Sequence, residues 1–575
     1  MDFSWGSGFD FEGKMKQRIS HRLLPLGILG LGILLFFGLG QVLRFRIDLT
    51  EEKRYSLHPS TLQLLEGIDR PLHVDILLTG EELPGGMRRL QKSIEETVRT
   101  FNAYSAENIS VSYFDPMEVT DSLKEEFIYT LADYGIRPTN LFVNQATGQQ
   151  AQLIFPGILV SDDTYETGAL VLKGERGMSA EQTLNASIEN LEFELAQAIQ
   201  KLLYPQKSAL AMIIGHGELA EDDGFGMVEA LDGRYELFKV PLEQAKKVED
   251  LSSFAAVFIL GPDSAYSDRE LFLLDQYVMG GGNLVVAAEG ANLDLSQLAG
   301  EGALALPQEN GLDRLLFRYG VRVSKDLIQD LNFGVIPVMG GNFGNQEQLV
   351  PMPWPYHFHA GRMYPHPITK GLDQVNFRFA SSLDTVKADG VKKTPLLFSS
   401  ERSRILPLPH LISLEAFQEP PLESEFGIKY LPLAYLLEGE FTSLFKNRFV
   451  PAEFSGSSVK NSGNGKVIVL GDASLFQSQI NPADQEPLPL GEDPMEQTTF
   501  ANKQFLENIV QYLTDPEGII ATRTKVLQIR PLDKVKVAEE KQFWQLINVG
   551  APVLFLVLMG GVIGLLRVKR FSRRA

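Results

Sequence analysis

The chain has 575 residues, 44% of them hydrophobic and 22% charged, which is enough for two or three globular domains with sizeable cores. Its formal net charge is −20, which disfavours binding to nucleic acid and to anionic lipid head groups. It contains no cysteine, which excludes disulfides, thiolate metal sites and cysteine nucleophiles and leaves the redox compartment open.

Two uncharged apolar stretches, residues 23–43 and 547–566, are each long enough to cross a membrane. The first is longer than the apolar core of a usual signal peptide, and no small-x-small cleavage site follows it. We therefore expect a retained anchor rather than a cleaved signal. Lysine and arginine crowd residues 567–575, which predicts a cytoplasmic basic tail. Both termini are then expected in the cytoplasm, and the acidic bulk from residue 44 to about 544 in the periplasm or its equivalent.

A smaller α/β module is predicted for residues 44–205, after a flexible cytoplasmic lead at 1–22. Alternating apolar residues predict a strand at 72–78, helical spacing predicts a helix at 87–104, and a second strand follows at 109–114. Together these three elements form a β-α-β unit.

Two capping boxes mark helix starts later in this module. Ser122 with Glu125 predicts a helix to about Tyr134, and Ser179 with Gln182 predicts a long helix through Leu203. We expect the long helix to join the smaller module to the larger domain.

Residues 206–524 are predicted to form one large domain. Short apolar strands at 209–214, 255–260 and 284–288 alternate with helices, one of which begins at the capping box Ser267 to Glu270 and stops at three glycines, 280–282. This alternation predicts a parallel, doubly wound sheet.

The rest of the large domain is less regular. Residues 334–367 are rich in Gly, Pro and aromatic residues and predict a long loop, of a length typical of functional or interface segments. Strand patterns return at 375–379, 396–399 and 466–470, a helix is predicted at 502–513, and a charged connector at 525–546 leads to the second span. The predicted fold class is thus α/β: a large extracytoplasmic doubly wound domain plus a smaller α/β module, flanked by two transmembrane helices.

The sharpest local motif is Gly215-His216-Gly217-Glu218, which directly follows the strand at 209–214. In open α/β sheets ligands bind at the carboxyl ends of strands, and glycines let the backbone approach a ligand or turn tightly. His216 and Glu218 are candidates for binding a ligand or partner, and for acid–base chemistry. The alternative is a tight turn with exposed polar side chains.

Two further acids follow predicted strands. Asp472 ends the strand at 466–470 and is expected to face the same crevice, unless it caps a helix instead. Glu289 follows the strand at 284–288, where a nucleophile elbow lies in some hydrolases; with no Ser or Cys in the turn, a surface turn is the simpler interpretation.

Other motifs point away from metal and nucleotide chemistry. His357 and His359 would suit zinc if extended, but no third ligand is near and the aromatic neighbours suggest packing. The glycines at 340–344 have no lysine and the wrong spacing for a phosphate loop, and no Walker motif occurs, so the chain itself is not expected to be an ATPase. We predict no metal site, no cofactor and no catalytic residues.

Several sequence blocks resemble a known family from about Arg46 to the second span. The blocks are Arg46-Ile-Asp-Leu-Thr-Glu-Glu-Lys-Arg-Tyr-Ser-Leu, Gly215-His216-Gly217-Glu218, His366-Pro367-Ile368-Thr369-Lys370-Gly371-Leu372-Asp373, Phe379-Ala-Ser-Ser-Leu-Asp384, Ser443-Leu-Phe-Lys-Asn-Arg448 and Val467-Ile-Val-Leu-Gly-Asp472. In number and order they resemble the GldG family, the gliding-motility-associated ABC transporter auxiliary or "substrate-binding" proteins.

The resemblance implies a bacterial inner-membrane protein that works with a separate ABC permease and a separate ABC ATPase, in gliding motility or in cell-surface protein secretion or transport. It also implies a large domain similar to glutamine-amidotransferase-like folds without their catalytic cysteine, and this chain has none. The family supplies neither catalytic residues nor a ligand.

The expected function is a non-enzymatic, membrane-anchored auxiliary subunit of an ABC transporter. Gly215, His216, Gly217, Glu218 and Asp472 are its candidate contacts with a ligand or partner. The alternatives are a membrane-tethered hydrolase of envelope glycan or peptide, which the missing Cys and the lack of a Ser-His-Asp order disfavour, and a structural scaffold.

Overall fold

The computed structural model describes residues 56–572, apart from gaps at 81–82, 146–147, 175–177, 220–224, 301, 344–345, 416–421, 457, 482–483 and 525–533. The predicted cytoplasmic lead, the first predicted span and the start of the smaller module lie outside the described residues. By their contacts, residues 57–575 form one compact unit, which contains all of the described helices and strands.

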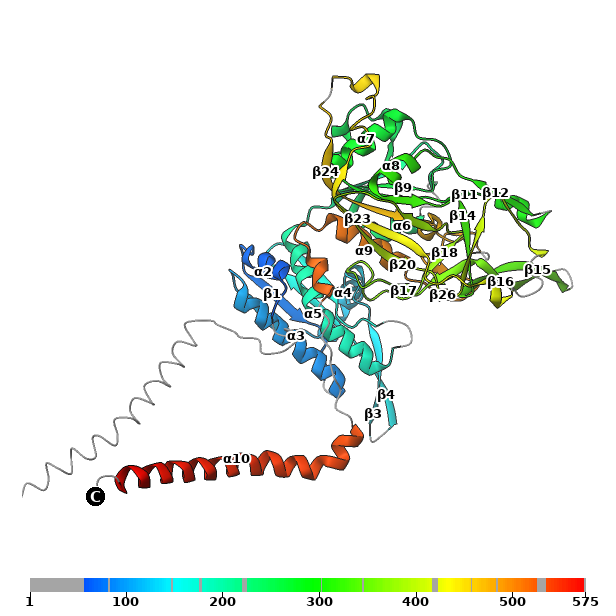
Figure 1. The fold of residues 1–575 in the computed structure, drawn as a ribbon. Coiled ribbons are helices and arrows are strands. Elements are labelled where there is room, and N and C mark those ends of the chain that lie inside the picture. Colours follow the sequence, from blue (N-terminus) through cyan, green and yellow to red (C-terminus); the bar gives the residue numbers. More distant parts are fainter. Residues whose placement is uncertain are drawn as a thin grey trace, which may run out of the picture. The chain divides into compact units, whose positions relative to one another are not determined.

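A four-stranded sheet forms the first part of this unit (Figure 1). Its order is β2-β1-β5-β6, and its strands are β1 (Leu72–Ile76), β2 (Ile109–Tyr113), β5 (Gly157–Ser161) and β6 (Glu166–Leu170). Strand β1 pairs with β2 in parallel through the connecting helix α3 (Gly85–Tyr104), which confirms the predicted β-α-β unit.

Helices cover this sheet with apolar faces. Helix α3 buries Leu90, Ile94, Val98 and Phe101, which recur at helical spacing. It contacts α5 (Ala180–Leu203), which begins at the predicted capping box of Ser179 and Gln182. The remaining elements here are α2 (Pro59–Glu66), α4 (Asp121–Asp133) and the hairpin β3 (Thr139–Gln145) with β4 (Gly148–Ile154).

The predicted capping box at Ser122 is wrong. Helix α4 begins at Asp121, so Ser122 is already inside the helix. Thr120 occupies the N-cap position, without a side-chain hydrogen bond. A capping box requires the serine or threonine to precede the first helical turn, so Ser122 lies too far inside the helix.

The core of this part is completed by residues from far along the chain. Ile519 and Ile520 lie in a short 3₁₀ helix, Ile519–Thr524, and are buried among the apolar side chains of α2, α3 and α5. The Gln200 amide also donates a 3.0 Å hydrogen bond to the Asp515 carboxylate.

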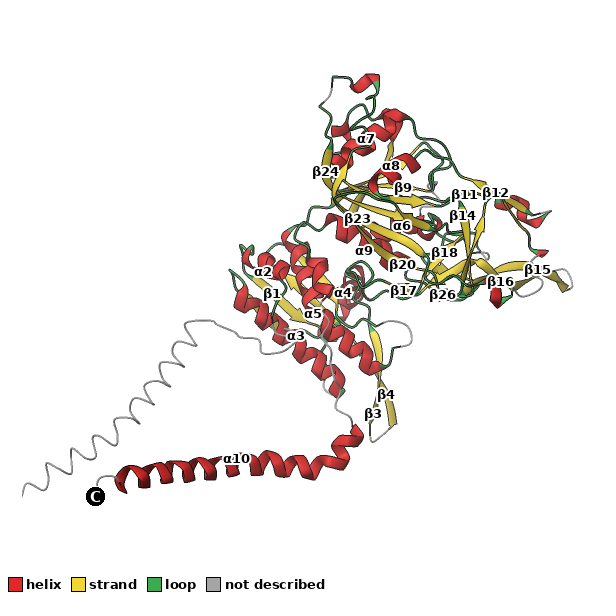
Figure 2. Ribbon diagram, viewed as in Figure 1, coloured by secondary structure: helices red, strands yellow, loops and turns green. Residues whose placement is uncertain are grey.

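An eight-stranded sheet forms the centre of the second part (Figure 2). Its order is β17-β20-β23-β24-β10-β9-β7-β8, and its strands are β7 (Ser208–Ile214), β8 (Tyr235–Pro241), β9 (Ala256–Leu260), β10 (Asn283–Ala287), β17 (Arg362–Met363), β20 (Val391–Phe398), β23 (Pro432–Thr442) and β24 (Ser462–Leu470).

Only β8, β7, β9, β10 and β24 are mutually parallel, so the prediction of a parallel sheet is correct for these strands alone. Strands β23, β20 and β17 each run antiparallel to the preceding neighbour. Parallel pairing requires a long crossover, usually a helix, and the described residues between β20 and β24 contain no α-helix.

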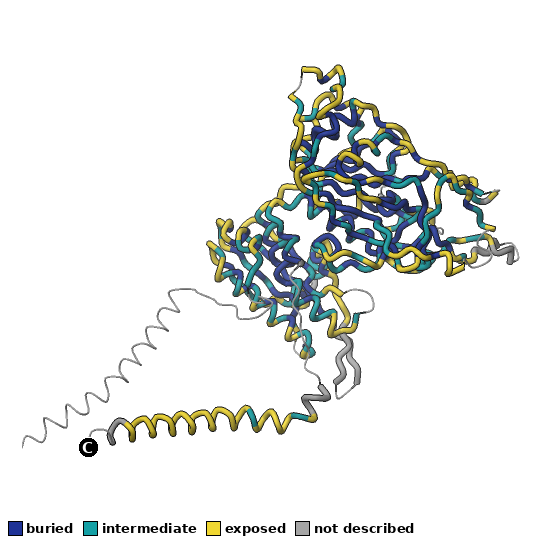
Figure 3. Tube along the Cα trace, in the orientation of Figure 1, coloured by how far each residue is buried: buried dark blue, intermediate teal, exposed yellow. Residues whose placement is uncertain are grey.

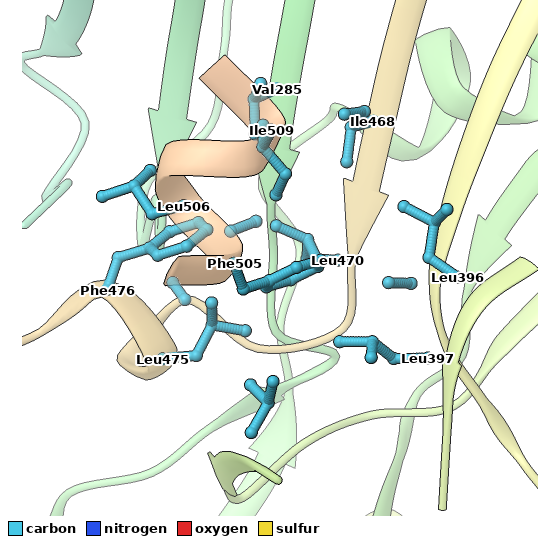
Figure 4. Close-up of a cluster of buried hydrophobic side chains, with 14 of the residues drawn as sticks. Val285, Leu396, Leu397, Ile468, Leu470, Leu475, Phe476, Phe505, Leu506 and Ile509 are labelled. Carbon is cyan, nitrogen blue, oxygen red and sulfur yellow. The ribbon is translucent and has the colours of Figure 1, made fainter. Parts of the chain in front are cut away.

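Helices cover both faces of this sheet, as a doubly wound fold requires. Helix α7 (Asp268–Met279) begins at the predicted capping box of Ser267 and Glu270 and packs on one face, against β10, β23 and β24. Helices α6 (Phe225–Leu231) and α9 (Asn502–Thr514) pack on the other face. Figure 4 shows the side chains of α9 meeting those of the sheet strands. The central strands are therefore buried on both faces (Figure 3), which accounts for their uninterrupted apolar sequences.

Residues between β10 and β23 form several small sheets beside α8 (Asp313–Tyr319). These are β11 (Ala291–Asn292) with β12 (Ala303–Pro307) and β22 (His410–Ile412), β13 (Val321–Val323) with β19 (Leu383–Thr385), β14 (Asp326–Asp330) with β21 (Ser403–Pro407), and β15 (Phe333–Phe343) with β16 (Gln346–Ala360) and β18 (Val375–Arg378); β25 (Glu492–Asp493) and β26 (Thr498–Thr499) follow β24.

The long loop predicted at 334–367 is wrong, because most of it is the hairpin of β15 and β16. Its prolines suggested a loop, but Pro351, Pro353 and Pro355 occupy alternate positions of β16. Pro351 lies opposite Pro337, and two residues without N–H groups can only face each other at a non-hydrogen-bonded position. The missing donors of all three prolines therefore point to the other edge of the strand, where a sheet tolerates proline.

Helix α10 (Lys534–Ser572) contains the second predicted span, 547–566, and extends into the predicted connector and tail. Within it, Glu539–Lys569 is the one helix of the described residues long and apolar enough to cross a membrane, with a mean hydropathy of 2.4. Its apolar window has no buried residue (Figure 3). The first predicted span lies outside the described residues.

Candidate functional site

The Gly215–Glu218 motif forms a tight turn at the carboxyl end of β7. Gly215 and Gly217 have φ angles of 118° and 75°, a region that favours glycine. The carbonyl oxygen of His216 accepts hydrogen bonds from the backbone N–H groups of Asp263 and Ser264, at 2.8 and 3.1 Å. The turn after β7 is thus fastened to the segment after β9, and both glycines are exposed.

The His216 side chain is buried in a polar group that we name the His216 cluster: His216, Glu218, Tyr266 and Glu270. The imidazole stacks on the Tyr266 ring, with centroids 3.9 Å apart. Its Nε2 lies 3.2 Å from Glu270 Oε1, and its Nδ1 lies 3.5 Å from Glu218 Oε1. Glu218 also accepts hydrogen bonds from the Tyr266 hydroxyl and from the His216 backbone N–H.

Burial and neighbouring charges shift the pKa values of two members of the His216 cluster, Tyr266 and Glu270. Burial, followed by the charge of Glu218, raises the pKa of the Tyr266 hydroxyl, which stays protonated. Burial would raise the pKa of Glu270, but hydrogen bonds from Ser267 and the nearby His216 outweigh it and lower that pKa. Since Ser267 and Glu270 also cap α7, Glu270 has a structural role. The buried Nδ1 of His216 has no hydrogen-bond partner among the described residues.

Asp472 belongs to a different group at the carboxyl end of β24. It is fully buried, and its two carboxylate oxygens accept 2.7 Å hydrogen bonds from the backbone N–H groups of Arg378 and Ser474. The second bond reaches the first residue of the short 3₁₀ helix Ser474–Phe476, whose N-cap is Ala473 and which has no side-chain cap hydrogen bond, so the capping alternative is not confirmed. The structure therefore brings His216 and Glu218 together and places Asp472 apart from them, in contact with other residues.

The neighbour of Asp472 is Glu289, and we name the two the Glu289–Asp472 pair. Glu289 accepts a 3.2 Å hydrogen bond from the backbone N–H of Ala473. Burial, and then the charge of Asp472, raises the pKa of Glu289 to about 7. Burial likewise raises the pKa of Asp472 to about 6. The simpler prediction for Glu289, a surface turn, is wrong because this carboxyl is partly enclosed.

The chain itself covers the sheet edge above the Glu289–Asp472 pair. The Ser381 hydroxyl accepts a hydrogen bond from the Gly290 N–H, and the Ser381 N–H donates one to the Gly471 carbonyl. A Cβ atom on Gly471 would lie 2.2 Å from the Ser381 carbonyl oxygen, and one on Gly290 would lie 1.9 Å from that of Ser324. Glycine is thus required where this segment closes over the strand ends.

Further ionisable groups near the pair were not predicted. Arg378, on β18, has its pKa lowered by burial and held up in part by the charges of Asp493 and Asp472. His357, opposite Arg378 on β16, has its pKa lowered well below the usual range by burial. The sequence carried one signal for the pair: Glu289, as Asp472 does, comes shortly after a buried apolar strand.

The predicted histidine pair is packed as its aromatic neighbours suggested. His359 stacks on Phe500 with centroids 4.3 Å apart, and its Nε2 lies 3.1 Å from Glu496 Oε1. In the part of the chain that the structure describes, no group of three His, Asp or Glu side chains is arranged to hold a metal ion.

A cavity of about 930 Å³ lies at the opposite edge of the sheet, where the parallel strands begin. Helices α7 and α9 end at this cavity, and their carboxyl ends carry partial negative charge. Lys460 and Lys466 among its lining residues offset that charge, and the Lys466 ammonium also lies 4.4 Å from the centre of the Tyr512 ring.

The mixed sheet, covered on both faces by helices, and its enclosed polar groups define an α/β protein. Residues 207–509, more than half of the chain, match the family described as "ABC-type uncharacterized transport system" (ABC_transp_aux), and the chain belongs to this family. Membership supports an auxiliary, non-catalytic role in transport. Residues 51–161 match a domain of unknown function, DUF7088.

Known proteins show the same organisation over most of the chain. An uncharacterized protein of Borreliella burgdorferi is 23% identical over 538 residues, which cover 92% of this chain and 93% of that protein.

Solved structures align with about half of the chain at low scores. The mmIFT52 N-terminal domain aligns over 54% of this chain and 98% of its own length, with a TM-score of 0.31 and 15% identity. Putative thua-like proteins of Bacteroides uniformis and Parabacteroides merdae align over 54% and 57% of this chain and 92% and 94% of their own, with TM-scores of 0.26 and identities of 12% and 14%. We draw no conclusion about this chain from these alignments.

Proposed function

We propose that this protein is a non-catalytic, membrane-anchored auxiliary subunit of an ABC transporter complex of the GldG type. The observation that carries the proposal is the family match over 207–509, which includes every strand of the eight-stranded sheet. The apolar helix within α10 supports a membrane anchor in the same chain.

The geometry of the polar groups favours a binding or coupling role over catalysis. The side chains of the His216 cluster contact one another, and the Ser381 hydroxyl holds the segment that follows Glu289 through the Gly290 N–H. A general acid or base must lie within hydrogen-bonding reach of a substrate, and neither group is open in this way.

In the proposed arrangement both predicted spans hold the chain in a bacterial inner membrane, with both termini cytoplasmic and the α/β body periplasmic. A separate permease and a separate ATPase bind the chain, and ATP hydrolysis on the ATPase drives shape changes that pass to the body. The proposed process is gliding motility or cell-surface protein secretion or transport.

The proposed contact with ligand or partner is the turn Gly215–Glu218, because its glycines expose the backbone while the side chains hold it rigid. Asp472 is fully buried and would take part only by supporting the neighbouring segments. Alanine at His216 and Glu218 should therefore reduce transport while the folded protein remains abundant. Asp389→Ala, at an exposed site, is the matched control.

The test of the assembly is affinity purification of the full chain in mild detergent, with mass spectrometry of the co-purifying proteins. We expect a permease and an ATPase at a fixed ratio to the chain. An unrelated tagged membrane protein from the same cells controls for carry-over. A solitary protein in several detergents, with α10 intact, would contradict the stable-subunit proposal.

A hydrolase acting on envelope glycan or peptide remains the second candidate, because two neighbouring carboxyls with raised pKa values resemble an acid–base pair. Its test is turnover of envelope glycan or peptide by the purified chain. If turnover occurs and Glu289→Gln abolishes it, the hydrolase replaces the auxiliary subunit as the proposed function. If no substrate turns over and partners co-purify, the hydrolase is rejected.

A further inference from the structure

The buried Asp275 carboxylate fixes the start of the loop between β23 and β24. Asp275 of α7 is fully buried and accepts hydrogen bonds from the Ser443 hydroxyl at 2.6 Å and from the Leu444 backbone N–H at 2.8 Å. Phe445 packs edge-on against Phe272 with centroids 5.2 Å apart. Ser443, Leu444 and Phe445 belong to the sequence block Ser443–Arg448. The buried residues at its start anchor the loop, and Arg448 at its end is exposed.

The loop presents a cation and an aromatic ring to solvent. Arg448 is exposed, and its guanidinium makes no ion pair or hydrogen bond with another of the described residues. Phe449, which follows it, is 100% exposed. A partner that covered this ring would remove apolar surface from water, which is favourable.

Arg448 also lines a cavity of about 720 Å³, within the range of about 300–1,000 Å³ typical of ligand sites. We name this cavity the basic pocket. Its other cations are Arg314, Arg322 and Lys325, and Phe317 on its rim is 57% exposed.

The charge of the basic pocket is opposite to that of the whole chain. Four cations meet two acids, Asp313 and Asp326, in a protein whose net charge is −20. Asp326 is buried and turned toward Ser382, which donates to both of its oxygens, so it does little to offset the cations. Asp313 pairs with Lys325 at 2.9 Å, and Arg314 and Arg322 pair with acids at exposed positions, where a competing carboxylate can replace the partner.

We propose that the basic pocket is a docking site for an acidic, aromatic- or leucine-containing peptide segment of a partner protein. The carboxylates of the segment pair with Arg448 and the neighbouring cations, and its apolar side chains cover Phe317 and Phe449. The two phenylalanines extend the apolar surface beyond the cavity, so the occupant is larger than a small anion. The inference does not depend on the transporter assignment.

The test measures binding of fluorescein-labelled peptides to the full chain in detergent by fluorescence anisotropy. The probe is the pentapeptide Glu-Leu-Glu-Phe-Asp, and the control peptide has lysine at its three acidic positions. We expect saturable binding of the acidic peptide only, weakened when sodium chloride rises from about 50 to about 500 mM because screening acts on exposed charges.

Matched variants separate the pocket from general charge. Arg448→Glu should weaken binding about tenfold or more, whereas Lys446→Glu, the same charge change in the same exposed loop but outside the cavity, should change it by less than about twofold. Phe449→Ser should weaken binding without changing its salt dependence. Thermal unfolding of each variant checks that the fold is intact.

Three outcomes would overturn the proposal. They are equal binding of the two peptides, equal effects of the two loop variants, and binding of phosphatidylglycerol vesicles through Arg448 without any binding of peptide. The last outcome would identify the site as one for lipid head groups.

Discussion

At the residue scale, the Glu289–Asp472 pair shows how the same side-chain type acquires different chemistry from its surroundings. Both carboxyls follow apolar strands, yet burial raises their pKa values to about 7 and about 6, with the charge of Asp472 contributing to the higher value of Glu289. A folded-state pKa above the unfolded value means that the fold prefers the protonated acid. This preference is fully present below the unfolded pKa and is lost as the pH rises through the folded pKa.

Glu289→Gln should therefore flatten the dependence of stability on pH. In the wild-type chain, the contribution of Glu289 falls as the pH rises from about 4.3 to about 7, by roughly 3–4 kcal/mol. Glutamine keeps an acceptor for the Ala473 N–H and does not ionise, so this loss disappears. Denaturant midpoints at pH 5.5 and pH 8 measure the difference, with Glu440→Gln, at an exposed site on β23, as the control. An unchanged pH slope in Glu289→Gln would contradict the assigned pKa.

The turn at Gly217 requires glycine, both for its backbone conformation and for the space around its Cα atom. With φ at 75°, an L-residue there costs about 1–2 kcal/mol. A Cβ would also lie 2.0 Å from the Asp263 carboxylate, which must move. Gly217→Ala should lower the melting temperature, whereas Gly427→Ala, where a Cβ meets no atom within 4 Å, should leave it nearly unchanged. Equal melting temperatures for the two variants would show that the turn relaxes freely.

At the element scale, the loop carrying Arg448 depends on helix α7 through one acid. Asp275 accepts hydrogen bonds from Ser443, Leu444, Gln276 and Tyr319. Asp275→Ala leaves these buried donors unpaired and should cost about 3 kcal/mol of stability. Calorimetry of the full chain measures the loss, and Asp389→Ala, at an exposed site, should shift stability by less than about 0.5 kcal/mol.

Elements whose signals are local could be predicted from the sequence. The helices that begin at Ser179 and Ser267 carry complete capping boxes, and α3 carries a clear helical period, so all three agree with the prediction. Strands buried on both faces, such as β7 and β9, have apolar runs that set them apart from loops.

Elements that depend on distant partners could not be predicted. Three prolines in β16 predict a loop, because proline cannot donate a backbone hydrogen bond. They are compatible with a strand only because β15 pairs with the edge of β16 that does not need their donors. The antiparallel strands β20 and β23 have no sequence signal for their direction. In the His216 cluster, the sequence indicated His216 and Glu218. Tyr266 and Glu270 come from the segment after β9; Tyr266 carries no pattern of its own, and Glu270 carries only that of the capping box.

At the scale of the whole molecule, the number of membrane anchors is open to a direct test. Leu554→Arg with Leu558→Arg places two charges in the apolar part of α10, at about 2.5–3.5 kcal/mol each for insertion. If residues 23–43 are a second anchor, this variant stays in the membrane pellet after carbonate extraction, and only charging both stretches releases it. Release by the α10 substitutions alone would show that α10 is the sole anchor.

Because Ile519 and Ile520 come late in the sequence, the core of the first part can be completed only late in synthesis. Strands β1, β2, β5 and β6 leave the ribosome early, but the last side chains of their core are made after the eight-stranded sheet. At about 5–20 residues per second, the interval between the end of α5 and these isoleucines is roughly 15–60 s. The nascent first part therefore waits with an unfilled apolar gap, a state that chaperones recognise. Closure of that gap reports that every strand of the eight-stranded sheet has already been translated.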